Sequence, residues 1–404
     1  MFFRLRRSLI LIRVLLIPSS DYLGHPFPQR HNQIFERLHD GKNFEVHVLR
    51  YNLYDKPKLE SKLVIHEVDD FGIKPIAPYY LFNARRHAVE MRNIIRRESI
   101  DAIVLSNLAA PFAYMILDTF SSMHKPVIFD LPDYYPTSAT GYLFNVRSVV
   151  GNTFSGFFDS ILRHMMRRAS IVTAASHALA GYAERSGARR VAVVSNGIAE
   201  CFLELHNGKG LREKFGYDEH DIVAGYIGSL EFWLDMQSFI KGVALARKRG
   251  MSAKLLIVGS KLQTNYFGKV VQWIKQENLE KHTDFLDFVP HEDVPVHISA
   301  IDAGAIPFDL YNPTAYYAAP NKMWEYLSQK RPVICTPIPE ALSNFDCLLT
   351  ALTPEDYAEH LVQVASRKEE ITQKVETGYK RALNRTWKDS ARVFASIVES
   401  LVRA

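Results

Sequence analysis

The chain has 404 residues, of which 47% are hydrophobic and 23% charged, a composition typical of a globular protein long enough for two domains. Its formal charge is only +5, and its three cysteines (Cys201, Cys335 and Cys347) lack metal-ligand spacing, so we expect reduced thiols in a cytosolic protein rather than a disulfide frame. Arginines gather at 4–13 and 163–168 beside apolar residues. This pattern favours an anionic membrane surface over nucleic acid, unless these are simply solvated basic faces.

The first twelve residues combine arginines with apolar residues and superficially resemble a signal peptide. The apolar run continues past Arg13 into a buried strand at 14–18, and no small-residue cleavage site follows, so we expect no cleaved signal. No uncharged stretch approaches the roughly 20 residues that a membrane-spanning helix needs. An interfacial anchor is the remaining membrane option for this end.

A loop at 19–30 joins this strand to a helix that ends near residue 39, which is the opening of an α/β unit. The loop lacks the G-x-G-x-x-G spacing and is therefore not a dinucleotide-binding fingerprint. Further short apolar runs follow at 44–50, 62–68, 101–106, 126–131 and 171–176. Their alternation with helical stretches predicts a parallel sheet covered by helices on both faces.

Asp133 follows the predicted strand at 126–131. The catalytic residues of α/β enzymes lie beyond the carboxyl ends of parallel strands. Asp133 is therefore a candidate general base that takes a proton from an acceptor hydroxyl. Asp130 is the rival base. The structural alternative is that Asp133 caps the following turn.

Residues 141–168 interleave aromatic residues with glycines and end in an arginine-rich run. This segment fits a lipid-interface element, and it fits a core helix preceded by a mobile loop equally well. A strand at 190–198 contains the turn signal Asn196-Gly197 and closes the first half of the chain. The polar run at 204–221 then resembles a linker.

The alternation restarts with a strand at 222–227 that leads into Gly228 and Ser229, where a glycine lets the backbone approach a ligand closely. Gly259 follows the next strand, at 254–258. Helices at 236–249 and 266–277 and strands at 285–289 and 303–307 continue the pattern. A later loop holds Tyr316 and Tyr317, whose rings either stack on a base or sugar or pack the domain edge.

Residues 320–334 contain the most informative motif, Pro-Asn-Lys-Met-Trp-Glu-Tyr-Leu followed by Arg-Pro-Val-Ile. We predict a helix that starts at Pro320, with Lys322 in its first turn and Glu325 one turn later on nearly the same face. A lysine beside the free N–H groups of a helix start suits a phosphate, whereas a carboxylate one turn on suits sugar or ribose hydroxyls. The motif therefore indicates a sugar nucleotide; the alternative is an ordinary (i, i+3) ion pair.

This motif resembles the donor-site signature P-x-K-x-x-E-Y-L-x-x-x-x-P-V of group-1-like (GT4-like) glycosyltransferases, with membrane-associated polysaccharide glucuronosyltransferases as more distant kin. The resemblance implies that Lys322 holds the donor diphosphate and Glu325 holds donor hydroxyls. It also places Asp133 at the strand end that carries the proposed base in the inverting kin. Tyr317 stands where the commonest retaining pattern has a glutamate, so inversion and retention both stay open.

The resemblance extends these roles to further residues. The implied donor contacts come from Asn321, Met323, Gly228, Ser229, Gly259, Tyr316 and Tyr317. The implied acceptor contacts come from Gly24, Gln29, Arg30 and Tyr134.

The implied fold is α/β of the GT-B type, with two Rossmann-like, doubly wound parallel-sheet domains facing across a cleft. We expect an acceptor-binding domain at 1–200, a donor domain at 201–385, and a helix at 386–404 that crosses back to the first domain.

The predicted activity is transfer of a hexose-type sugar from a UDP- or GDP-linked donor to a hydroxyl of a glycan or lipid-linked precursor in polysaccharide biosynthesis. No Asp-x-Asp motif is present, so we expect neither a metal nor a cofactor. We expect a cytoplasmic protein bound peripherally to the inner face of the membrane. The alternatives are a sugar-nucleotide epimerase of the same fold and a non-catalytic sugar-nucleotide-binding subunit.

Overall fold

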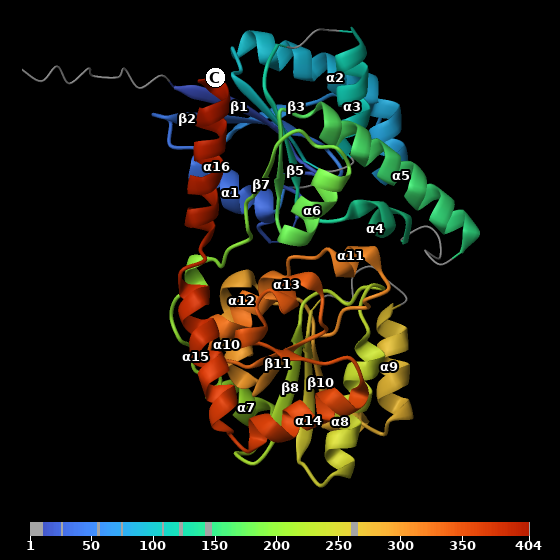
Figure 1. Cartoon of the computed structure of the whole chain (residues 1–404), viewed down its shortest axis with the longest axis vertical. Helices are drawn as coiled ribbons and strands as arrows, with labels where there is room; N and C mark the ends of the chain where they lie inside the picture. The colour runs from blue at the N-terminus through green and yellow to red at the C-terminus, as the bar shows by residue number, and fades with distance from the viewer. Residues whose placement is uncertain are drawn as a thin grey trace, which may run out of the picture. The chain divides into compact units, whose positions relative to one another are not determined.

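A computed structural model describes residues 11–25, 27–54, 57–73, 76–106, 109–120, 124–141, 148–259 and 266–403. The chain forms two compact units (Figure 1). Unit 1 comprises Met1–Pro136, Thr153–Ser195 and Trp387–Ala404, and unit 2 comprises Thr137–Asn152 and Asn196–Thr386. The aromatic and basic residues at 1–10, on which part of the membrane prediction depends, lie outside the described residues.

Unit 1 is built on a parallel sheet that has seven strands in the described part of the chain, in the order β3-β2-β1-β4-β5-β6-β7. These strands are β1 (Ile12–Ile17), β2 (Phe44–Arg50), β3 (Val64–Glu67), β4 (Ala102–Ser106), β5 (Val127–Leu131), β6 (Ile171–Ala174) and β7 (Val191–Val193). The central strands β4 and β5 are buried along their whole length, as the continuous apolar runs of a sheet covered on both faces should be.

Helices cover both faces of this sheet (Figure 1). They are α1 (Arg30–Leu38), α2 (Ile76–Arg97), α3 (Ala109–Phe120), α5 (Val149–Arg168), α6 (His177–Arg185) and the C-terminal α16 (Trp387–Val402). The short helix α4 (Tyr135–Gly141) begins in unit 1 and continues into the segment Thr137–Asn152 of unit 2. On one face α1 packs against α16, where the rings of Phe35 and Phe394 meet edge to face at 5.0 Å. On the other face α2 packs against α3.

Unit 2 contains a parallel sheet of order β10-β9-β8-β11-β12-β13 among its described residues. Its strands are β8 (Ile222–Ile227), β9 (Ala253–Val258), β10 (Thr283–Leu286), β11 (Ala303–Ile306), β12 (Val333–Cys335) and β13 (Leu349–Thr350). Its helices are α7 (Lys209–Phe215), α8 (Met236–Lys248), α9 (Tyr266–Gln276), α10 (Val294–Ala300), α11 (Pro313–Tyr316), α12 (Asn321–Ser328), α13 (Pro339–Leu342), α14 (Pro354–Ala365) and α15 (Glu369–Leu383). Short 3-10 turns occupy Glu200–Phe202, Glu280–His282, His291–Asp293 and Phe345–Cys347.

The strand order reverses once in each sheet, between β1 and β4 in unit 1 and between β8 and β11 in unit 2. Ligands of open α/β sheets bind beyond the carboxyl ends of the strands at such reversal points. The predicted fold class, two doubly wound parallel sheets, is thus confirmed, and each reversal point marks a candidate site.

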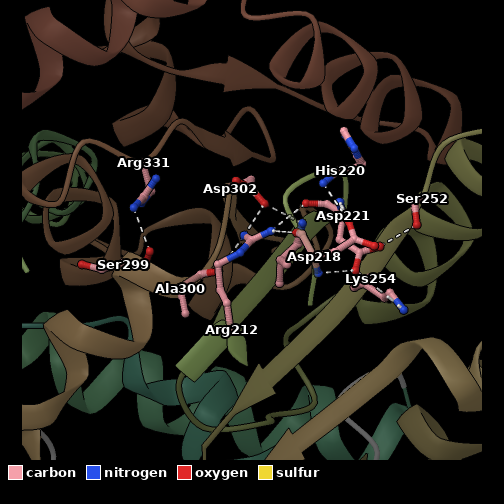
Figure 2. Close-up of polar contacts among 11 residues, drawn as sticks. Arg212, Asp218, His220, Asp221, Ser252, Lys254, Ser299, Ala300, Asp302 and Arg331 are labelled. Atoms are coloured by element: carbon pink, nitrogen blue, oxygen red, sulfur yellow. Dashed lines mark hydrogen bonds and ion pairs between the residues drawn. The ribbon is translucent and has the colours of Figure 1, made fainter. Parts of the chain in front are cut away.

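The polar run at 204–221, predicted as a linker, is instead helical over α7 and fastened to the sheet of unit 2. The Arg212 guanidinium donates to the Asp302 carboxylate at 2.8 Å and to the carbonyl of Asp221 at 2.8 Å (Figure 2). Asp221 and Asp302 immediately precede β8 and β11, so this network lies at the amino edge of the sheet, opposite the candidate site. Tertiary contacts therefore override the weak helix propensity of a glycine-containing segment.

Two predicted strands are shorter or shifted. The strand expected at 190–198 extends only over β7, and the one expected at 285–289 is β10, which ends at Leu286. Among the described residues, none of the helices combines the length and the apolar character that crossing a bilayer requires.

Candidate functional site

Two glycines shape the carboxyl ends of β8 and β9 in unit 2. Gly228 has a φ of 145° and Gly259 a φ of 154°, a backbone region that favours glycine. The N–H of Gly228 donates to the carbonyl of Val258 at 2.7 Å, and a Cβ on Gly259 would lie 2.0 Å from the Gly228 carbonyl oxygen. A Cβ on Gly228 would lie 2.7 Å from Lys322 Nζ. The missing side chains thus let two strand ends and a lysine converge.

Lys322 lies in the first turn of α12, as predicted from the motif. Its ammonium is 5.2 Å from the centre of the Tyr226 ring and, in the described part of the chain, makes no ion pair or hydrogen bond. Burial lowers the pKa of Lys322 below its ordinary value, although nearby carboxylates oppose this shift. A half-buried cation that forms no ion pair with any described residue, beside the free N–H groups of a helix start, is suited to an anion.

Asn321 and Met323 flank Lys322 in this first turn. The Asn321 Oδ1 atom is buried and accepts no hydrogen bond within the described structure, so it is an open acceptor at the helix start. The Met323 side chain is fully buried, which leaves only its backbone to face a ligand. The Ser229 carbonyl accepts a hydrogen bond from the Tyr226 hydroxyl at 2.6 Å, and this fixes the loop that follows Gly228.

Glu325, one turn after Lys322, lies beside a histidine that the sequence did not single out. Its Oε1 atom is 3.9 Å from Nε2 of His291, which begins the 3-10 turn after β10. Burial lowers the pKa of His291, but the interaction with Glu325 outweighs burial, so that this pKa lies above its ordinary value. A carboxylate and an imidazole that converge in this way can accept from and donate to the hydroxyls of a sugar or ribose.

The two tyrosines predicted to contact the donor lie at the end of α11. Their rings meet edge to face at 5.1 Å, and the Tyr316 side chain is 43% exposed whereas that of Tyr317 is half-buried. The same short helix is held by a hydrogen bond of 2.8 Å between the hydroxyls of Thr314 and Thr137. These rings thus pack against each other and also leave one ring exposed. Both predictions for them, stacking on a base or sugar and packing of the domain edge, therefore remain open.

Asp130, near the end of β5 in unit 1, is fully buried and surrounded by donors. The Arg30 guanidinium donates two hydrogen bonds of 3.2 Å to its carboxylate, and Thr173 Oγ1 donates a third at 2.7 Å. Nε2 of His31 lies 3.6 Å away. Burial raises the pKa of Asp130, but the charge of Arg30 and the hydrogen bonds outweigh it and hold the pKa below its ordinary value. Such a carboxylate is a poor proton acceptor.

Asp133, two residues beyond the end of β5, is in a different environment. Its side chain is half-buried and receives no hydrogen bond in the portion that the structure describes. Burial raises the pKa of Asp133 to about 7, and the negative charge of Asp130 adds to this shift while Arg30 opposes it. A carboxylate that titrates near neutral pH is matched to general-base catalysis.

The other acceptor candidates of unit 1 make structural contacts. A Cβ on Gly24 would collide with the ring of Tyr54 at 2.2 Å, so this glycine is required for packing. Gln29 is the N-cap of α1, and its N–H donates to Asn32 Oδ1 at 2.9 Å. The Tyr134 hydroxyl donates to Asp159 at 2.9 Å.

Sequence reasoning missed His31, Thr173 and His291. Thr173 lies within a predicted strand, and His31 lies in the helix next to Arg30. No sequence motif marks either residue, and only the folded sheet brings them close to Asp130. His291 is far from Glu325 in the chain, and only the fold joins them. Among the described residues, no group of three or more histidine, cysteine, aspartate or glutamate side chains could hold a metal ion.

Two family models match the chain in succession. The model "Glycosyltransferase Family 4" matches residues 33–200, and the model "Glycosyl transferases group 1" matches residues 221–367. By sequence alone, no curated protein matches significantly.

Solved structures that resemble the chain do so along nearly its whole length. Sucrose-phosphate synthase from Thermosynechococcus elongatus is 13% identical with a TM-score of 0.76, covering 96% of this chain and 99% of its own. Anabaena HepE in complex with UDP-glucose is 16% identical with a TM-score of 0.72, covering 96% and 100%. Trehalose 6-phosphate synthase from Burkholderia multivorans is 12% identical with a TM-score of 0.68, covering 98% of each chain.

At such identities the structures report on the fold alone, while the two models report on the family. A family 4 domain followed by a group 1 domain, together spanning most of the chain, means that this chain belongs to the group 1 and family 4 glycosyltransferases, and its two doubly wound sheets have the GT-B fold.

Proposed function

We propose that the protein transfers a sugar from a UDP-linked donor to a hydroxyl acceptor without the help of a metal ion. The observation that carries this proposal is the ammonium of Lys322, unpaired within the described residues, beside Gly228 at the start of α12. Glu325 follows one turn later with His291 beside it. The Lys322 ammonium and the start of α12 are suited to binding the diphosphate of the donor. The Glu325 carboxylate and the His291 imidazole are suited to binding its hydroxyls.

We also propose that the nucleobase of the donor is uracil. Two structural neighbours support uridine: HepE was solved with UDP-glucose, and the trehalose-phosphate synthase from Burkholderia xenovorans is described as UDP-forming. A GDP-linked donor is the competing outcome of the test below.

Asp133 is the general base in this proposal. It takes the proton of the acceptor hydroxyl while the acceptor oxygen bonds to the anomeric carbon and the bond from that carbon to the diphosphate oxygen breaks. Lys322 and the N-terminus of α12 stabilise the negative charge of the departing UDP, the role that a metal ion has in other transferases. A single displacement of this kind inverts the anomeric configuration.

The acceptor that we propose is a glycan or lipid-linked precursor, reached by peripheral docking on the inner face of the membrane. The arginine run at 163–168 is a weaker support than its sequence suggests. Arg163 and Arg168 form ion pairs with Asp159 and Asp118, and Arg167 donates to a backbone carbonyl. Basic residues elsewhere in unit 1 therefore matter more for docking.

Release of nucleoside diphosphate from UDP- and GDP-sugars, with and without acceptor, tests the proposal. Acceptor-dependent release of UDP that persists in a chelator is the expected result. Conversion of the sugar without release would identify an epimerase, and nucleotide binding without any turnover would identify a non-catalytic subunit. Release that stops in the chelator would refute the metal-independent mechanism.

A further inference from the structure

Helix α2 of unit 1 has an outer face that is both apolar and basic. Leu81, Phe82 and Val89 are 56%, 61% and 47% exposed, and Arg85 and Arg86 between them are exposed as well. Phe82, Arg85, Arg86 and Val89 follow the i, i+3, i+4, i+7 spacing of one helical face. The opposite face is buried in the unit, with Asn83, Ala84, His87, Ala88, Met91 and Ile94.

A further aromatic side chain extends this face. Phe71 is 56% exposed, and its N–H donates to Asn83 Oδ1 at 3.0 Å, which ties the preceding loop to α2. The Arg86 guanidinium lies 3.7 Å from the centre of the Phe71 ring. The aromatic ring and the arginine therefore form one surface, which we call the α2 face: Phe71, Leu81, Phe82, Arg85, Arg86 and Val89.

The charge of α2 is strongly one-sided. The helix contains five arginines and a single acidic residue, Glu90. Arg97 pairs with Glu90 and Glu98, whereas Arg85, Arg86 and Arg96 form no ion pair within the described residues. In contrast to the arginines at 163–168, these cations are available to an external anion.

We infer that the α2 face docks unit 1 onto an anionic lipid surface. Apolar side chains that stand in water between unpaired arginines match the headgroup boundary, where rings and aliphatic chains insert and arginines meet lipid phosphates. A nucleic acid would satisfy the arginines but leave Leu81, Phe82 and Val89 without a favourable contact. This inference assigns the membrane docking of the proposed function to a particular surface of unit 1. It rests on the proposed function in one respect, namely that the acceptor is linked to a membrane lipid.

The test is flotation of the full-length protein with vesicles of phosphatidylcholine, alone or containing phosphatidylglycerol, at low and high salt. The wild type is expected to float with the anionic vesicles and to be released in part by salt. Leu81→Ser with Phe82→Ser should remove the salt-resistant part of binding, and Arg85→Glu with Arg86→Glu should weaken binding by about tenfold or more. The matched control is Arg392→Glu with Val393→Ser on the exposed side of α16, which should bind like the wild type.

Circular dichroism and UDP affinity, measured on the same samples, establish that each variant is folded and keep the two proposals separate. Lys322→Ala should lose UDP affinity yet float normally. Failure of the wild type to float while it binds UDP would overturn the docking inference alone. The inference would also be overturned if the protein bound neutral vesicles as well as anionic ones, or if both α2 variants bound anionic vesicles as well as the wild type. It would be overturned as well if the wild type self-associated and Phe82→Ser abolished this, because the face would then bind a second copy of the chain.

Discussion

Gly228 and Lys322 depend on each other: the glycine has a φ of 145°, and any Cβ there would lie 2.7 Å from the lysine ammonium. Gly228→Ala should therefore strain the backbone at a cost of about 1–3 kcal/mol and displace Lys322, with weaker nucleotide binding as a result. Gly268 in α9 is the matched control, because nothing lies within 4 Å of its added Cβ. Gly268→Ala should stabilise by about 0.5–1 kcal/mol. Equal nucleotide affinity in both variants, measured by calorimetry, would contradict this account.

Removal of the lysine itself should separate binding from folding. Lys322→Ala is expected to weaken UDP binding by about 1.5–3 kcal/mol, or about one to two decades in affinity, because a charge-assisted contact to the diphosphate is lost. Stability should not fall, since the ammonium is partly desolvated and has no ion pair among the described residues. Lys330→Ala, which breaks an ion pair with Glu376 instead, should leave UDP affinity unchanged. An unaltered affinity in Lys322→Ala would remove the donor-site assignment.

Asp133 and Asp130 should respond differently to the same substitution. Asp133→Asn is expected to reduce turnover by about two to four decades and to spare UDP binding, because the amide cannot accept the proton. Asp130→Asn should instead lower the free energy of unfolding by about 3–5 kcal/mol, since it leaves the Arg30 charge buried without its partner.

The pH dependence of turnover gives an independent check on Asp133. The base must be deprotonated, and burial raises the pKa of Asp133 to about 7, so kcat/KM should rise with pH and level off above neutrality. A profile that is flat between pH 5 and about 8 would shift the role to a group of lower pKa or to a mechanism without an enzymic base.

The sequence predicts those parts of the two sites whose residues are close together in the chain. The donor motif is contiguous, so helix start, lysine and carboxylate could be placed from spacing, and short apolar runs predict the two parallel sheets. The contacts of Asp130 with Arg30 and of Glu325 with His291 join residues far apart in the chain, and no local pattern reports them. The helix α7 was missed for the same reason, because Arg212 holds it by tertiary contacts.

Arg212 should accordingly matter for stability and not for the donor. Arg212→Ala removes the hydrogen bonds to the Asp302 carboxylate and to backbone carbonyls at the amino edge of the sheet (Figure 2). We expect the free energy of unfolding to fall by about 3 kcal/mol, because partly buried acceptors lose a charged donor. Denaturant titration measures this, and UDP affinity below the unfolding transition should match that of the wild type. A loss of affinity in the folded variant would show that the network is coupled to the donor site.

His87 should make unit 1 less stable in acid. Its ring lies 4.9 Å from that of Tyr51, and its Nε2 atom is buried with no hydrogen-bond partner in the described structure. Burial lowers the pKa of His87 to about 4, and the charge of Asp70 opposes this shift. The unfolded chain therefore binds a proton more readily than the native state, so stability rises with pH and is lost as pH falls from about 6.5 to about 4, by up to about 3 kcal/mol. His87→Gln removes this titration and should flatten the melting temperature between pH 7 and 5, whereas His220→Gln, at an exposed position, should keep the wild-type slope. Identical slopes for the two variants would mean that other groups, such as His25 or His66, whose pKa values burial also lowers, carry the acid sensitivity.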